Sequence, residues 1–154
     1  GKLKHRGPNI VTSLELDPAE MEKRNIHLQQ KYAEIEEKEV RYEEIHCDDA
    51  EYLIVAFGSC ARIAQKAMEE ARAEGIKVGL LRPITLWPFP SKAIAERSRQ
   101  VKGILTVELN AGQMVEDVRL AVECKVPVEY FGRLGGIVPD PDEVVTALKE
   151  KIIK

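Results

Sequence analysis

The sequence predicts an α/β fold in which helices cover both faces of a mostly parallel sheet, with a long helix ahead of it. Two observations carry this prediction. From about residue 41, short apolar runs alternate with segments whose apolar residues recur every three or four positions, which is typical of strands alternating with helices. One run, YLIVAF at 52–57, is apolar throughout, as a strand buried on both faces of a sheet requires.

Composition sets the scale of the molecule. With 154 residues, 44% of them hydrophobic and 32% charged, the chain fits one globular domain at 41–154 and an extension at 1–40 made of a linker and an amphipathic helix. A formal net charge of −3 gives no basic surface for nucleic acid. No apolar run approaches the roughly 20 residues of a membrane span and no signal peptide opens the chain, so we expect a cytoplasmic protein.

The first helix begins with a clear signal. Asp17 provides an N-cap carboxylate, Pro18 suits the first helical position, and Glu20 follows as an acid in the first turn. The helix should run to about residue 40. Its apolar positions form a narrow stripe made of Met21, Leu28, Tyr32 and Ile35. This stripe docks either on the chain's own domain or on another subunit, and we expect the isolated chain to self-associate.

Strands and helices then alternate along the chain. Gly75 is placed to close the helix that follows YLIVAF, and the prolines of GLLRPITLWPFP should stop a central strand at Arg82. Asp140 and Pro141 repeat the opening cap before the last helix. The sequence predicts strands at 41–47, 52–57, 77–81, 103–108 and 126–130, and helices at 60–74, 92–98, 112–124 and from 141 onward.

Two of the strand-end loops offer different chemistry. Gly58, Ser59 and Arg62 open a helix whose N-terminus could hold the phosphate of CoA or another anion; alternatively, Ser59 caps the helix and Gly58 permits the turn. Trp87 and Phe89 stand between prolines in a stiff loop, where they either fill the domain's own core or dock into a partner.

The next two loops carry polar candidates. Glu108 could orient a ligand or accept backbone hydrogen bonds at the start of the following helix, with Asn110 and Gln113 beside it. Arg133, between glycines, suits a carboxylate, a phosphate or an acidic residue of a partner, or else it is solvated. We therefore take Trp87, Phe89, Glu108, Asn110, Gln113 and Arg133 as interface candidates.

The cysteines predict no metal site and no catalytic residue. Cys47, Cys60 and Cys124 are odd in number and lack CxxC spacing, which indicates free thiols in a reducing compartment. Cys60 follows a strand as a nucleophile would, but the histidines all lie in the N-terminal third of the chain.

Several of these segments together resemble a known family. GLLRPITLWPFP at 79–90, ELNAGQM at 108–114, GRLGG at 132–136 and AFGSCARIA at 56–64 resemble the C-terminal, transketolase-C-like domain of the α subunit of 2-oxoacid:ferredoxin oxidoreductases, and the match begins at PNIVTSLELDP, 8–18. The long helix and RYEEIH at 41–46 are most similar to the 2-ketoisovalerate (3-methyl-2-oxobutanoate) branch. The resemblance implies a three-layer α/β/α fold with a five-stranded mixed sheet whose first strand is antiparallel.

The resemblance also implies a reaction for the complete enzyme, which converts a 2-oxoacid, CoA and oxidised ferredoxin to acyl-CoA, CO₂ and reduced ferredoxin. Thiamine diphosphate, Mg²⁺, iron–sulfur clusters and CoA belong to that enzyme. This chain has neither GDG…N nor CxxCxxC, so we expect it to carry no cofactor and to be inactive alone. Its role would be assembly with the other domains and subunits, and it could shape the approach of CoA. The alternatives are a free-standing nucleotide- or anion-binding module, a purely structural docking domain, or 2-oxoglutarate specificity.

Overall fold

The computed structural model describes residue 7 and residues 14–153, and it divides the chain into a first unit, 1–35, and a second unit, 36–154. Most of the PNIVTSLELDP segment lies outside the described residues.

Helix α1, Pro18–Lys38, supplies most of the described first unit. The carboxylate of Asp17 accepts hydrogen bonds from the backbone N–H groups of Ala19 and Glu20, at 2.8 and 3.3 Å, so the predicted cap is confirmed. No residue of α1 is buried. Its apolar stripe therefore keeps exposed surface, and both alternatives for its partner remain predictions.

The second unit is built on one sheet. Its strands are β1 (Tyr42–Ile45), β2 (Tyr52–Ala56), β3 (Val78–Pro83), β4 (Ile104–Glu108) and β5 (Val128–Gly132). They lie in the order β1-β3-β2-β4-β5, with β1 antiparallel to β3 and the other neighbours parallel. The expected mixed sheet with an antiparallel first strand is confirmed.

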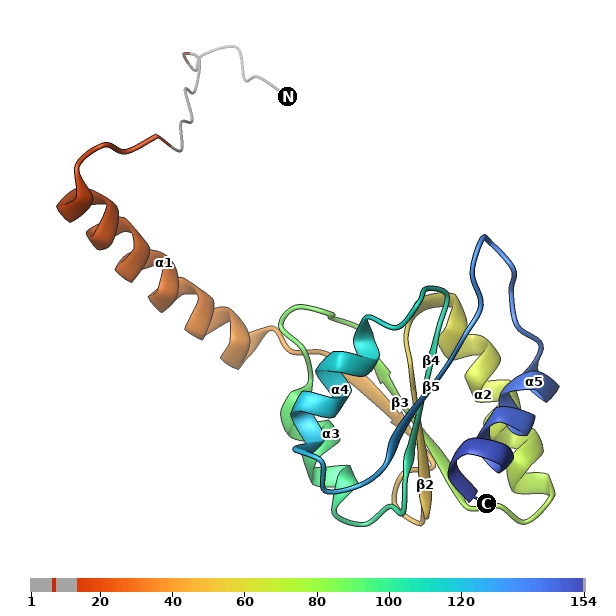
Figure 1. Ribbon diagram of the computed structural model, residues 1–154. Coiled ribbons are helices and arrows are strands. Elements are labelled where there is room, and N and C mark those ends of the chain that lie inside the picture. Colours follow the sequence, from red (N-terminus) through yellow and green to blue (C-terminus); the bar gives the residue numbers. More distant parts are fainter. Residues whose placement is uncertain (1–6, 8–13, 154) are drawn as a thin grey trace. The chain divides into compact units, whose positions relative to one another are not determined.

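Helices cover both faces of this sheet (Figure 1). On one face lie α2 (Gly58–Ala73) and α5 (Pro141–Leu148), and on the other lie α3 (Ser91–Ser98) and α4 (Met114–Val122). Each face buries an apolar layer, because the strands are apolar on both sides and each helix is apolar on one. This is the predicted three-layer arrangement.

Most boundaries differ from the sequence prediction by one to three residues, and three element ends are informative. Helix α2 begins at Gly58 with Phe57 as the N-cap residue, so the expectation that Ser59 caps the helix was wrong. Strand β3 includes Pro83, because β2 pairs with β3 only as far as Leu81 and Pro83 faces β1 alone. Helix α5 ends at Leu148 and continues as one π-helical turn, Lys149–Ile153.

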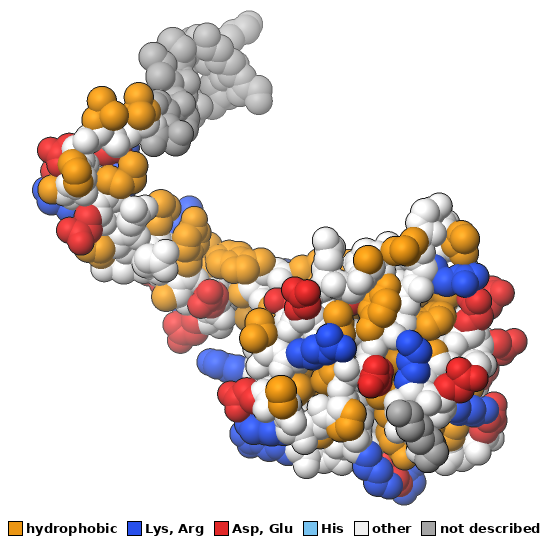
Figure 2. Space-filling model, in the orientation of Figure 1, with side chains coloured by type: hydrophobic (Ala, Val, Ile, Leu, Met, Phe, Trp, Pro, Cys, Tyr) orange, Lys and Arg blue, Asp and Glu red, His pale blue; other side chains and the backbone are white. Residues whose placement is uncertain are grey.

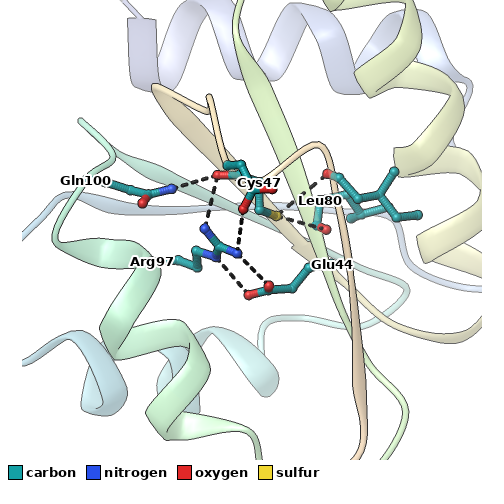
Figure 3. Close-up of polar contacts among 7 residues, drawn as sticks. Glu44, Cys47, Leu80, Arg97 and Gln100 are labelled. Carbon is teal, nitrogen blue, oxygen red and sulfur yellow. Dashed lines mark hydrogen bonds and ion pairs between the residues drawn. The ribbon is translucent and has the colours of Figure 1, made fainter.

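Near the amino ends of the parallel strands, polar contacts join the end of α3 to β1 and the turn after it, as drawn in Figure 3. Arg97, near the end of α3, bonds to Glu44 of β1, and the side chain of Gln100 donates to the carbonyl of Cys47 at 2.6 Å. The thiol of Cys47 is buried beside the carbonyl of Leu80. This edge is held by structural contacts, so the search for a functional site turns to the opposite edge.

Candidate functional site

The four parallel strands end at one edge of the sheet, called here the carboxyl edge, and four loops leave it. In the order of the strands these loops are 84–90 after β3, 57–62 after β2, 109–113 after β4 and 133–140 after β5, where 57–62 consists of Phe57 and the first turn of α2. The site residues predicted from sequence all come from these loops or from the strand end before them. The fold therefore brings to one edge residues that are up to 75 positions apart in the chain, Gly58 and Arg133.

Glu108, the last residue of β4, is fully buried and bonds to the start of α4. One carboxylate oxygen accepts hydrogen bonds from the backbone N–H groups of Met114 and Gln113, at 2.8 and 3.2 Å. The other accepts from Val115 at 3.0 Å. A carboxylate at a helix N-terminus satisfies N–H groups that the helix cannot and lies favourably in its dipole. Glu108 thus occupies the anion position at the start of α4 itself. Of the two roles considered from the sequence, this is the one in which Glu108 accepts backbone hydrogen bonds at the helix start.

The loop after Glu108 is a compact turn. The side-chain oxygen of Asn110 accepts hydrogen bonds from the N–H groups of Gly112 and Gln113, at 2.7 and 3.2 Å. Gly112 has φ +98°, a conformation in which a side chain would be strained. The side-chain oxygen of Asn110 is therefore used inside the loop, while Gln113 is exposed.

Tyr130 of β5 is a residue of this site that sequence reasoning missed. Its hydroxyl donates to the backbone carbonyl of Asn110. A Cβ at Gly132 would collide with that hydroxyl, so Gly132 provides the space for the phenol ring. Residues two apart in a strand lie on the same face, so a tyrosine two positions before a glycine can place its ring over that glycine. This spacing was the signal in the sequence that could have indicated Tyr130. Burial, followed by the nearby Glu108 and Cys60, raises the pKa of Tyr130, which keeps the hydroxyl a donor.

Arg133 is paired within its own domain. Its backbone N–H donates to the carbonyl of Glu108 at 3.3 Å, and its guanidinium lies 3.3 Å from a carboxylate oxygen of Glu143. The other oxygen of Glu143 accepts from the N–H of Asp140, which completes the capping box of α5. Arg133 therefore links the β5 exit to the start of α5, and any contact with a partner would compete with Glu143.

The start of α2 is exposed. Gly58 has φ +56° and open space where a Cβ would lie, and Ser59 and Arg62 are exposed. Cys60 is buried, and desolvation together with the negative charge of Glu108 raises the pKa of its thiol. A thiol with a raised pKa is a poor nucleophile at neutral pH.

The two aromatic residues of the 84–90 loop have different surroundings. Phe89 packs against the apolar layer under α3 and α4, whereas Trp87 is 56% exposed. The peptide bond between Trp87 and Pro88 is cis. Only Trp87 of the pair therefore presents substantial surface outward.

The carboxyl edge is rich in exposed apolar side chains and poor in charge. We use the name apolar edge for the exposed residues on three of its loops: Ile84, Leu86, Trp87, Leu109, Leu134, Ile137 and Val138. The four loops contain three charged residues, Arg62, Arg133 and Asp140, in a chain that is 32% charged. Figure 2 shows orange side chains along this upper side of the domain.

Within the part of the chain that the structure describes, no group of three or more His, Cys, Asp or Glu side chains is arranged to hold a metal ion. The same residues include no helix that is both long enough and apolar enough to cross a bilayer.

Comparison with known proteins identifies the family. Residues 50–144 match the model of pyruvate:ferredoxin oxidoreductase core domain II. The chain belongs to this family. Ketoisovalerate oxidoreductase subunit VorB of Methanothermobacter thermautotrophicus is 51% identical over 142 residues, which make up 92% of this chain and 40% of that protein. The resemblance to the ketoisovalerate branch, expected from sequence, is confirmed.

Solved structures extend the comparison to the fold. A 2-oxoglutarate:ferredoxin oxidoreductase from Magnetococcus marinus, solved with 2-oxoglutarate, CoA and succinyl-CoA bound, aligns with a TM-score of 0.76 and 25% identity over 88% of this chain and 24% of that chain. A split-gene transketolase aligns with a TM-score of 0.62 and 22% identity over 71% of this chain and 40% of that one, a likeness of fold alone. The expected transketolase-like fold is confirmed. This member of the core domain II family spans two fifths of the length of the VorB relative.

Proposed function

We propose that the chain is the non-catalytic C-terminal portion of the α subunit of a 2-oxoacid:ferredoxin oxidoreductase, and that its apolar edge docks on the other domains and subunits of that enzyme. The complete enzyme would convert a 2-oxoacid, CoA and oxidised ferredoxin to acyl-CoA, CO₂ and reduced ferredoxin in the cytoplasm. The core domain II match and the VorB relative support this proposal.

The observation that carries the docking role is the composition of the carboxyl edge. Its apolar side chains are 41–60% exposed and come from the exits of β3, β4 and β5. Clustered exposed apolar side chains in surroundings depleted of charge are typical of a surface that another protein covers.

The described residues do not fit the redox and thiamine cofactors of the complete enzyme. They include no cluster of metal-ligating side chains for Mg²⁺ or an iron–sulfur cluster, and Glu108 occupies the N-terminus of α4. These cofactors, and ferredoxin, would therefore bind through other parts of the enzyme. The open start of α2, with Gly58, Ser59 and Arg62, fits an anion such as a phosphate of CoA. Calorimetric titration of the chain with CoA and with ATP tests whether the start of α2 binds a phosphate of CoA. Binding of ATP would support the alternative of a nucleotide-binding module.

For the substrate, we favour a branched-chain 2-oxoacid over 2-oxoglutarate. The identity is 51% over 142 residues to the ketoisovalerate oxidoreductase subunit, against 33% over 101 residues to a 2-oxoglutarate synthase subunit KorA of Methanothermobacter marburgensis. Assay of the complete enzyme with 2-ketoisovalerate and 2-oxoglutarate, each with CoA and oxidised ferredoxin, decides between the two.

Docking is tested by placing charge on the apolar edge. Leu134→Asp and Val138→Asp should each weaken assembly with the remaining domains and subunits at least tenfold, because a carboxylate buried without a partner is costly. Leu120→Asp is the matched control, since Leu120 is exposed on α4 outside the carboxyl edge. Copurification of all components measures assembly. Equal assembly of the parent and both edge variants would remove the docking role.

Without its partners, the chain should self-associate through surface that the complete enzyme covers. Sedimentation velocity of the parent and of Leu134→Asp measures this. A monomeric parent at high concentration would show that the apolar edge does not bind a second copy.

A further inference from the structure

We propose that Glu108 and Tyr130 are positioning residues that hold the 109–113 loop in a single conformation ready for docking. This inference rests on the proposed docking role of the carboxyl edge. It adds which hydrogen-bonding side chains give that edge its shape.

Glu108 joins the two ends of the 109–113 loop by hydrogen bonds. The carboxylate belongs to the residue before the loop, and its acceptors reach the N–H groups of Gln113, Met114 and Val115, five to seven positions later. Because the side chain is fully buried and all three bonds run to successive backbone groups, the end of β4 and the start of α4 are fixed relative to each other. The intervening residues must span a set distance.

Tyr130 holds the loop from the side. It lies on β5, the neighbour of β4, and its hydroxyl donates to the carbonyl of Asn110 at the middle of the loop. Gly132 is required for this contact, because a Cβ there would meet the phenol and lie 2.9 Å from the same carbonyl. The side chain of Asn110 meanwhile bonds to Gly112 and Gln113, so the loop is restrained at both ends, from the side and within itself.

The exposed residue that these contacts orient is Leu109. It is 41% exposed and belongs to the apolar edge. Its neighbours in the chain, Glu108 and Asn110, are both held by the hydrogen bonds described above. A loop that is already ordered loses less conformational entropy when it binds, so its affinity is higher than that of a mobile loop with the same side chains. The buried bonds therefore act on docking without touching the partner.

Hydrogen exchange measures the order of the loop directly. Glu108→Gln keeps the shape of the side chain but removes its charge and turns an amide group toward N–H donors. We expect the amides of Gln113, Met114 and Val115 to exchange about tenfold faster or more. Tyr130→Phe, which removes one hydroxyl, should speed exchange in the 109–113 loop by a smaller factor and leave the fold intact.

Two control variants match these changes. Glu116→Gln removes a charge from the same first turn of α4, where Glu116 is exposed and outside the three carboxylate bonds. Tyr42→Phe removes a hydroxyl from an exposed tyrosine of β1. Both should leave exchange at 109–115 unchanged. Unchanged exchange in Glu108→Gln and Tyr130→Phe as well would overturn the inference.

Docking of the same variants with the remaining subunits completes the test. Tyr130→Phe should weaken docking about threefold to tenfold, mainly through slower association, since fewer loops are in the competent conformation. Faster exchange with unchanged docking would refute the positioning role and leave the proposed function standing. Failure of the proposed function shows separately, in the Leu134→Asp and Val138→Asp variants.

Discussion

The guanidinium of Arg97 and the carboxylate of Glu44 form a two-pronged ion pair that joins α3 to β1 (Figure 3). Nε lies 2.9 Å from one carboxylate oxygen and Nη2 lies 2.7 Å from the other. Arg97 also reaches the side chain of Asp48 at 3.1 Å and the carbonyl of Cys47 at 3.4 Å. The hydrogen bonds to Glu44 raise the pKa of Arg97, so the guanidinium stays charged. The ion pair fastens the antiparallel edge strand β1 to helix α3.

Replacing Arg97 by lysine should lower the free energy of unfolding by about 1–2 kcal/mol, because an ammonium cannot reproduce two parallel bonds to one carboxylate. The two side chains of the pair are partly covered, at 21% and 26% exposure, so solvent screens the ion pair in part. Lys125→Met breaks the exposed pair with Glu123 and should change the free energy by less than about 0.5 kcal/mol. Urea unfolding measures both. Equal effects would mean that the Arg97 pair is as weak as a surface pair.

The order of strands and helices could be predicted because short local sequence patterns determine it. The apolar run at 52–57, the cap at Asp17 and the glycine at 75 each specify an element within a few residues. The helix start at Gly58 was misjudged by two residues, because its positive φ places Phe57 rather than Ser59 at the cap.

The contacts that build the site could not be predicted, because they join segments far apart in the chain. Tyr130 and Asn110 are 20 positions apart, and Arg133 and Glu108, joined by a backbone hydrogen bond, are 133 − 108 = 25 apart. Their meeting depends on which strands are neighbours, which no local pattern specifies. Glu108 is the intermediate case: its position before a helix start allowed two roles, and only its burial decided that it bonds to the backbone of α4.

Stability should fall at alkaline pH, and Cys47 should account for part of the fall. Burial, followed by the charge of Glu44, raises the pKa of the Cys47 thiol from 9.0 to about 11. Between these values the unfolded chain loses the proton and the folded chain keeps it, so stability is complete below about pH 9 and declines as pH rises toward 11. The full shift of two units corresponds to roughly 2–3 kcal/mol.

The check is the difference between the parent and Cys47→Ala in urea unfolding at pH 7.5, 9 and 10.5. The variant should lose stability at every pH from lost packing, but its decline from pH 9 to 10.5 should be shallower than that of the parent. Cys60 and Tyr130, whose pKa values are also raised, remain in both proteins and contribute equally. Parallel declines would indicate that the Cys47 thiol ionises in the folded protein as readily as in water.

Replacing Gly79 by alanine should cost more stability than replacing Gly75. Gly79 lies in β3, paired with Leu53 of β2, and the turn after β1 packs directly on it. A Cβ at this position would lie 2.9 Å from the carbonyl oxygen of His46 and 3.0 Å from the Cα of Cys47, both backbone atoms. Neither can rotate away, so the turn or the strand must move. We expect Gly79→Ala to lower the free energy of unfolding by about 2 kcal/mol or more.

Gly75→Ala is the comparison. Gly75 has φ +88° and free space where a Cβ would lie, so its replacement adds only backbone strain of about 1 kcal/mol. Thermal and urea unfolding of the two variants rank them, and a larger loss for Gly75→Ala would show that the turn at His46 yields easily and does not fix the position of β1 on the sheet.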